Sequence, residues 1–134
     1  MENKRAYPII LKKDGSGYYV NIPDFDIGTQ GTTIVEAMEM ARDAIGLMGI
    51  DMQDDGEDLP EPFSKTVDVE EGDIHTLVDV DFVEYRKKVD NRAVKKNCTI
   101  PYWMSVQAEK ANINYSKVLQ DALAKQLGIM QNNI

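Results

Sequence analysis

Five carboxylates have the residue type that could hold two metal ions for phosphodiester cleavage. A two-metal nuclease needs several such groups converging on one spot. Here two carboxylates share one face of a predicted strand, two sit beside a turn, and one lies in a helix-capping motif. We therefore interpret them as strand, turn and capping residues. We expect a protein that is not an enzyme, with no catalytic residue, metal ligand or cofactor. The five are Asp24, Asp26, Glu36, Asp79 and Asp81.

The single histidine and the single cysteine restrict the remaining chemistry. His75 lies in a strand-like run, where an exposed or hydrogen-bonded side chain is expected rather than a general base. One histidine and one cysteine exclude a Cys/His zinc cluster, and one cysteine excludes an intramolecular disulfide. Cys98 lies in an alternating segment, which predicts a small core side chain and not a reactive thiol.

Charge is distributed unevenly along the 134 residues. Residues 1–90 have a formal balance of −12 and residues 91–134 a balance of +4, within a net charge of −8. Such asymmetry predicts two partners of opposite charge, a basic protein for the first part and phosphates for the second. No apolar run approaches the roughly 18 residues that span a bilayer, and the first residues have no signal-peptide pattern. We expect no membrane association and a cytoplasmic location.

The first ninety residues predict an α+β fold with the element order β-β-β-α-β. Alternating apolar residues indicate strands, and the turn residues between the first two indicate a hairpin. One antiparallel sheet with a helix packed on one face is the expected architecture. The predicted strands cover residues 7–13, 18–22, about 26–30, and 74–82.

The elements between these strands are also marked in the sequence. Thr33 and Glu36 match a capping box, which predicts the start of a helix. Gly46 and Gly49 are expected at its fraying end. The remaining segments are a solvated acidic loop over 51–58, a brief extended piece over 66–69, and a short charged helix or linker over 83–90.

The C-terminal residues predict one strand and two short helices. Residues 92–101 alternate, with an apolar face and a polar face. Pro101 suits the first turn of a helix, Ser116 is expected to cap a second helix, and Gly128 is expected to end it. The second helix has an apolar stripe. Its members are Val118, Leu119, Ala122, Leu123 and Leu127.

About forty residues of this kind cannot bury their apolar surface alone, and a lone strand leaves its backbone groups open. Two copies would solve both problems by pairing their strands and interlocking their helices. The paired strands would form a ribbon that fits the DNA major groove, and the second helix would offer its N-terminus to a phosphate. The expected dimer core is Cys98, Ile100, Trp103, Leu119 and Leu123. The expected DNA-binding residues are Lys95, Asn97 and Thr99 on the ribbon, and Tyr115, Ser116 and Lys117 at the helix.

Particular stretches of sequence resemble those of a known family. The N-terminal stretches Tyr7-Pro-Ile-Ile, Gly17-Tyr-Tyr-Val-Asn-Ile-Pro-Asp, Gln30-Gly-Thr-Thr-Ile-Val-Glu-Ala and Leu77-Val-Asp-Val-Asp-Phe are similar to the domain that defines HicB antitoxins. The C-terminal stretches are similar to the ribbon-helix-helix domain attached to HicB proteins. They are Lys96-Asn-Cys-Thr-Ile-Pro-Tyr-Trp-Met, Ala111-Asn-Ile-Asn-Tyr-Ser and Leu119-Gln-Asp-Ala-Leu.

This resemblance implies a partial ribonuclease H-like, toxin-binding domain over 1–88 and a ribbon-helix-helix domain over 89–134. It implies an antitoxin that neutralises a HicA-like basic, mRNA-cleaving toxin and represses its own operon as a homodimer or a tetramer. The outward ribbon residue is often arginine or glutamine in DNA-binding relatives, whereas this chain has Asn97 and Thr99 beside Lys95. That departure leaves the operator sequence open, and individual toxin contacts within 1–88 are not predicted.

Two other functions are compatible with parts of the pattern. The first is a stand-alone transcriptional regulator whose acidic domain senses a small ligand or only oligomerises. The second is an active nuclease, which would require the carboxylates to converge. A neighbouring short reading frame for a basic protein would separate the antitoxin from the regulator.

Overall fold

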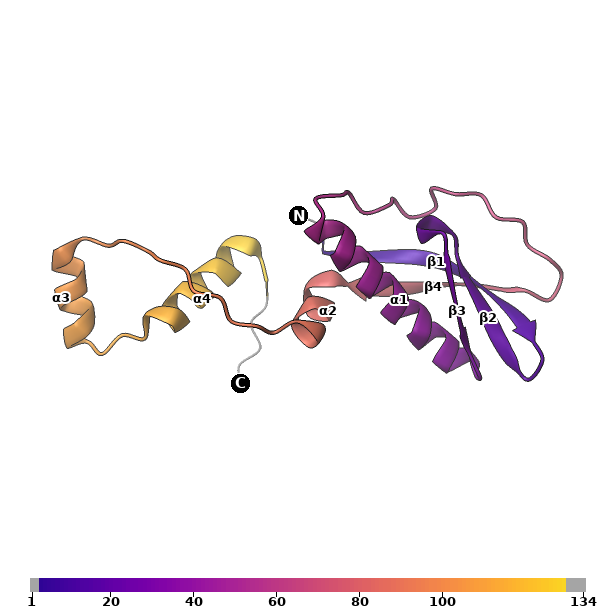
Figure 1. The fold of residues 1–134 in the computed structure, drawn as a ribbon, viewed down its shortest axis with the longest axis horizontal. Coiled ribbons are helices and arrows are strands. Elements are labelled where there is room, and N and C mark those ends of the chain that lie inside the picture. The colour runs from indigo at the N-terminus through magenta and orange to yellow at the C-terminus, as the bar shows by residue number, and fades with distance from the viewer. Residues whose placement is uncertain (1–2, 130–134) are drawn as a thin grey trace. The chain divides into compact units, whose positions relative to one another are not determined.

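The computed structural model describes residues 3–129, which form two compact units (Figure 1). The first unit extends to Ala93 and the second begins at Val94. The expected boundary between residues 88 and 89 falls inside the last turn of a helix that belongs to the first unit. Each unit is therefore described by itself.

The first unit contains a four-stranded antiparallel sheet in the order β3-β2-β1-β4. The central strand β1 pairs on one side with β2 and on the other with β4, so Leu11 lies between Val20 and Ile74. Gly15 has a φ of 60° in the turn between β1 and β2, a conformation that glycine adopts without steric cost. The strands are β1 Lys4–Asp14, β2 Gly17–Ile22, β3 Ile27–Gly31 and β4 Ile74–Asp81.

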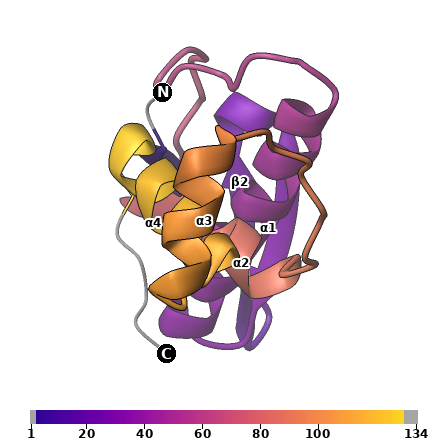
Figure 2. The same cartoon turned by 90° about the vertical axis from the view of Figure 1, so that its left-hand side faces the viewer.

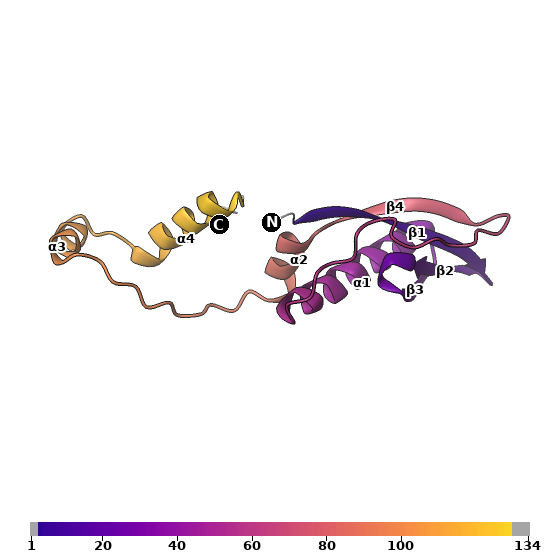
Figure 3. The ribbon, with the colours of Figure 1, turned by 90° about the horizontal axis from the view of Figure 1, so that it is seen from above.

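A long helix, α1 (Ile34–Asp54), covers one face of this sheet (Figure 3). Alternate residues of β1 point toward it, and the small residues of α1 allow close packing. Each fully buried aliphatic side chain contributes about 1.5–3 kcal/mol through removal of apolar surface from water. The fully buried members of this core include Tyr7, Ile9, Leu11, Val20, Ile22, Ala37, Ala41, Ile45 and Val78. The expected α+β architecture of this part is confirmed.

The start of α1 agrees with the sequence, but its end does not. Thr33 Oγ1 accepts a hydrogen bond from the Glu36 backbone N–H at 3.1 Å, as a capping residue does. The Glu36 carboxylate accepts from the backbone N–H and hydroxyl of Thr32, one residue earlier than a capping box requires. The helix continues to Asp54, so the expected loop over 51–58 begins four residues too early.

Gly46 and Gly49 do not end the helix, and the prediction that they mark its fraying end is wrong. Both are buried in the middle of its second half. A Cβ atom on Gly46 would lie 2.6 Å from the Tyr85 ring, and one on Gly49 would lie 2.2 Å from the Phe82 ring. The two glycines are therefore required for close packing against the next helix, and not for a break in α1.

That next helix is α2 (Phe82–Val89), where the sequence left a choice between helix and linker. Asp81 Oδ1 accepts from the backbone N–H groups of Val83 and Glu84, both at 3.1 Å, and so begins the helix. Phe82 itself is buried against the core. The strand β4 thus ends one residue before the predicted limit, because residue 82 already belongs to α2.

Two short segments differ from their predicted form. Residues 66–69 form no strand and belong to an irregular connection between α1 and β4. Pro23–Phe25 forms a short 3-10 helix, η1. Asp26 follows it with a φ of 54°, so β3 begins at Ile27 rather than at Asp26.

The second unit contains two helices, α3 (Tyr102–Lys110) and α4 (Tyr115–Leu127) (Figure 2), and residues 111–114 join them. Asn114, and not Ser116, caps α4, because its side-chain oxygen accepts from the Lys117 backbone N–H at 3.1 Å. Gly128 ends α4 with a φ of 65°, as predicted. Residues 90–101 have no regular structure in the single chain, so the strand predicted over 92–101 is not formed there.

Candidate functional site

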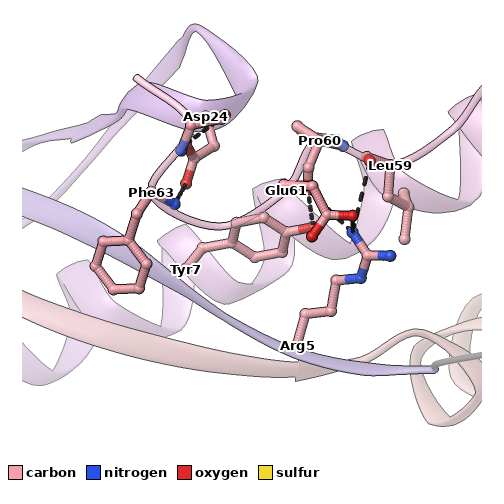
Figure 4. Close-up of polar contacts among 8 residues, drawn as sticks. Arg5, Tyr7, Asp24, Leu59, Pro60, Glu61 and Phe63 are labelled. Atoms are coloured by element: carbon pink, nitrogen blue, oxygen red, sulfur yellow. Dashed lines mark hydrogen bonds and ion pairs between the residues drawn. The ribbon is translucent and has the colours of Figure 1, made fainter. Parts of the chain in front are cut away.

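The five carboxylates considered for metal binding are dispersed and occupied by local contacts. Asp24 is buried, and its two oxygens accept hydrogen bonds from Phe63 N, Ser64 N and Ser64 Oγ at 2.9–3.0 Å. Figure 4 shows the contact with Phe63, which attaches the connection after α1 to η1. Asp24 is therefore a structural carboxylate whose oxygens are directed at this connection.

The other four are placed separately. Asp79 pairs with Arg42 at 3.3 Å, Asp81 caps α2, and Glu36 binds Thr32. Asp26 is exposed beside η1. Within residues 3–129, no three His, Cys, Asp or Glu side chains are grouped so as to hold a metal ion. The geometry gives no support to the nuclease alternative.

A polar network near the start of β1 holds the first half of the connection in place (Figure 4). Tyr7 is buried, and its hydroxyl donates to the Pro60 carbonyl at 2.8 Å. Arg5 Nη1 donates to the same carbonyl at 3.1 Å and lies 3.7 Å from the Glu61 carboxylate. Burial raises the pKa of the Tyr7 hydroxyl, so it remains a donor at neutral pH.

The far end of the connection is held by Lys12 and Asp73, whose Nζ and Oδ2 atoms lie 3.0 Å apart. The hydrogen bond to Asp73 raises the pKa of Lys12. Two hydrogen bonds lower the pKa of Asp73: the one from the Glu70 backbone N–H has the larger effect, and the one from Lys12 adds to it. The connection is thus attached at both ends, and its remaining acidic side chains face solvent. They are Asp55, Glu57, Asp58, Glu61, Asp68, Glu70 and Glu71.

A cavity of about 530 Å³ lies between the end of α1, the following residues and α2. Arg5 and Arg86 line it, together with the acidic residues Glu57 and Asp58. Arg86 is already engaged by Asp54 at 2.7 Å. Cations and anions are balanced around this cavity, so its charge does not select a small anionic or cationic ligand.

The second unit lacks a core of its own. No side chain from Val94 to Ile129 is buried. Of the expected dimer-core residues, Trp103 is 65% exposed and Leu123 is 48% exposed. Ile100, Leu119 and Cys98 are exposed as well. The single chain leaves this apolar surface in water, where it is unfavourable.

The expected DNA-binding residues occupy two places in that unit. Lys95, Asn97 and Thr99 are exposed in the irregular segment before α3. Tyr115, Ser116 and Lys117 form the first turn of α4. The first helical hydrogen bond of α4 is donated by the Val118 N–H, and the Lys117 N–H is already bound by the Asn114 side chain. The N–H groups of Tyr115 and Ser116 therefore have no acceptor within the helix.

Comparison with known proteins identifies the family. Residues 7–127 match the family described as the HicB-like antitoxin of bacterial toxin-antitoxin systems. The chain belongs to this family. It is also 35% identical over 100 residues to a 14.9 kDa protein from the rep-hol intergenic region of Haemophilus phage HP1, covering 71% of this chain and 72% of that protein.

Solved structures resemble this HicB-like chain over most of its length. A chain of a toxin-antitoxin complex from Streptococcus pneumoniae is 26% identical, with a TM-score of 0.55, and the match covers 92% of this chain and 99% of that one. The antitoxin HicB of Burkholderia pseudomallei is 25% identical, with a TM-score of 0.50 and coverage of 92% and 96%. The antitoxin HicB3 is 26% identical, with a TM-score of 0.50 and coverage of 95% and 100%.

The HicB-like match includes both units, and it agrees with the family predicted from the sequence. Sequence reasoning did not find the structural roles of Arg5, Tyr7, Lys12 and Asp73. The sequence gives only a weak indication of these roles, because an arginine or a tyrosine in a strand has many possible hydrogen-bond partners. Among the described helices, none is both long and apolar enough to cross a membrane.

Proposed function

We propose that this HicB-like chain is an antitoxin that binds and neutralises a HicA-like mRNA-cleaving toxin and represses its own operon by binding operator DNA. The observation that carries the proposal is the likeness to a chain of the Streptococcus pneumoniae toxin-antitoxin complex over 92% of the present chain. In this proposal the first unit binds the toxin, and the second forms a ribbon-helix-helix homodimer, or part of a tetramer, in the cytoplasm.

The charges of the two units support this division of work. The −12 balance of residues 1–90 would attract a basic toxin and repel nucleic acid, whereas the +4 balance of residues 91–134 suits phosphates. The exposed apolar side chains of α3 and α4 support dimerisation, because pairing two copies would remove them from water. The ribbon would then form from residues 90–101 of both copies, which have no ladder partner in one chain.

The experiment that tests the antitoxin role is co-expression with the small basic protein encoded beside this gene. The two proteins are purified together, and RNA cleavage is measured for the partner alone and in the complex. A stable complex that silences cleavage establishes the antitoxin role. No complex, with specific DNA binding retained, would instead leave a stand-alone ribbon-helix-helix regulator.

Binding of the toxin should weaken with salt. Surface charges are screened within a Debye length of about 8 Å at physiological salt, so an association steered by an acidic unit depends on ionic strength. Raising salt from about 50 mM to about 500 mM is expected to lower the affinity by about tenfold, chiefly through a slower association rate. Surface plasmon resonance measures both. An affinity that is unchanged over this range would contradict a role for the acidic surface.

Removing a ribbon side chain should weaken operator binding without affecting the dimer. Lys95→Ala and Asn97→Ala each delete a group suited to hydrogen bonding with base edges, and each loss should cost about 1–3 kcal/mol. Fluorescence anisotropy with operator DNA measures the affinity, and light scattering measures the dimer. Gln107→Ala, an exposed change on α3, is the control. Parental affinity in both ribbon variants would show that the ribbon is assigned to the wrong residues.

A further inference from the structure

The side of α1 that faces away from the sheet has apolar residues where a solvent-exposed helix would ordinarily have polar ones. Met40 is 41% exposed and Leu47 is 58% exposed, and the seven-residue spacing places both on one side of the helix. The helical period places four exposed carboxylates on the same side. We call this surface the α1 outer face, and it consists of Glu36, Met40, Asp43, Leu47, Asp51 and Asp54.

Contacts from α2 hold two of these carboxylates in position. The Tyr85 hydroxyl donates to Asp43 Oδ1 at 2.8 Å, and Arg86 Nη1 donates to Asp54 Oδ1 at 2.7 Å. Desolvation and the bond to Asp43 raise the pKa of Tyr85 to about 12, so the hydroxyl stays protonated as a donor. The Asp54 side chain is still 63% exposed. The face is therefore ordered before any partner arrives, which lowers the entropy lost on binding.

The first unit has a second exposed apolar surface, on the sheet face opposite α1. Within residues 3–93 no helix covers that face (Figure 3). The register places Pro8 beside Leu77 there, with Tyr19 nearby and Ile10 buried between them. Leu77 is 49% exposed and Tyr19 is 44% exposed. Apolar exposure alone thus does not decide which face receives a partner.

Charge separates the two faces. Helix α1 contains five acidic residues and one basic residue, and that basic residue, Arg42, is turned toward Asp79 of β4. On the open sheet face the register places two lysines and three aspartates, and Lys12 also pairs with Asp73 at 3.0 Å. The lysines are Lys4 and Lys12, and the aspartates are Asp14, Asp79 and Asp81. The two lysines offset part of the negative charge of this face, whereas no lysine or arginine belongs to the α1 outer face. A basic partner is therefore attracted more strongly to the α1 outer face than to the open sheet face.

We propose that the α1 outer face is the docking surface for the basic toxin, with Met40 and Leu47 as its apolar centre and the carboxylates as its rim. This inference rests on the proposed antitoxin function and names the surface that performs it. In protein–protein interfaces a few central, well-packed residues contribute most of the affinity, while charges at the rim raise the association rate.

The test compares two leucines of similar exposure on the two faces. Leu47→Lys places a like charge against a basic toxin and removes an apolar contact, so we expect the Kd for the co-purifying toxin to rise by about 100-fold. Leu77→Lys, on the open sheet face, should change the Kd by less than about threefold. Met40→Lys should also raise the Kd for the toxin, as Leu47→Lys does. Thermal unfolding of each variant alone confirms that the first unit is still folded.

A second pair tests the charge contribution separately. Asp51→Lys on the α1 outer face should slow association by about tenfold, whereas Glu71→Lys in the connection should slow it by less than about threefold. Parental binding by Leu47→Lys, or loss of binding by Leu77→Lys instead, would overturn the assignment while leaving the antitoxin function intact. A parent chain that fails to bind the toxin would overturn the proposed function itself, and the docking surface with it.

Discussion

Leu123→Asp is expected to abolish the dimer and operator binding together, while leaving toxin binding unchanged. In the single chain Leu123 is 48% exposed on the apolar stripe of α4, so an aspartate there costs the isolated chain little. In the proposed dimer the same position lies in a shared core. Burying a carboxylate without a partner should cost about 3 kcal/mol or more for each copy, or about 6 kcal/mol for the dimer, which raises the dimer dissociation constant by about 10,000-fold or more.

Analytical ultracentrifugation across a range of concentrations measures this dissociation constant, and anisotropy with operator DNA measures the second effect. Ala124→Asp is the matched control, because it adds the same charge to α4 on the side opposite the centre of the stripe. The control should retain the dimer. A dimeric Leu123→Asp variant would show that the shared core lies elsewhere and would remove the basis for the ribbon.

Alternation in the sequence was sufficient to predict the sheet of the first unit. Tyr7, Ile9 and Leu11 have the two-residue period of a half-buried strand, and all three are buried in the core. The capping residue Thr33 was also identifiable, because the cap is made within four residues of chain. Strand alternation and helix capping involve residues that are close together in the chain, so the sequence alone can predict them.

Longer-range contacts could not be predicted in the same way. Tyr7 binds Pro60 and Asp24 binds Ser64, pairs separated by 53 and 40 residues, and nothing in the local sequence specifies either partner. The cap of α4 was predicted at the wrong residue, because Asn114 and Ser116 are both good capping residues and lie close together in the sequence. The structure uses Asn114. The proposed ribbon and the proposed toxin contacts would form with other chains, so one sequence predicts them only through its family.

The glycines of α1 show a third kind of failure. A glycine near a helix end usually indicates the end itself, because it adopts the left-handed conformation that stops a helix. Gly128 fits this rule with a φ of 65°. Gly46 and Gly49 stay helical and are buried, because the rings of Tyr85 and Phe82 occupy the space where their side chains would be. Only the position of α2 explains them.

Gly49→Ala is therefore expected to destabilise the first unit, although alanine is the better helix former by about 1 kcal/mol. Its Cβ would lie 2.2 Å from Phe82 Cε1 and 2.8 Å from Cδ1, and Phe82 is buried in the core with only 1% of its surface exposed. The ring cannot move into solvent without losing that burial. We expect the overpacking to exceed the gain in propensity and to leave a net loss of about 1–3 kcal/mol in the free energy of unfolding.

Hydrogen exchange of the buried β1 amides measures that free energy for the first unit alone. Asp51→Ala is the control, because it makes an alanine at an exposed position of the same helix and should stay within about 0.5 kcal/mol of the parent. If the free energy of unfolding of Gly49→Ala matched or exceeded that of the parent, the contact between α1 and α2 would be looser than the structure indicates.

The contacts of Tyr85 and Arg86 that hold Asp43 and Asp54 on the α1 outer face depend on the same packing. A destabilised Gly49→Ala variant should consequently bind the toxin more weakly than the parent chain does.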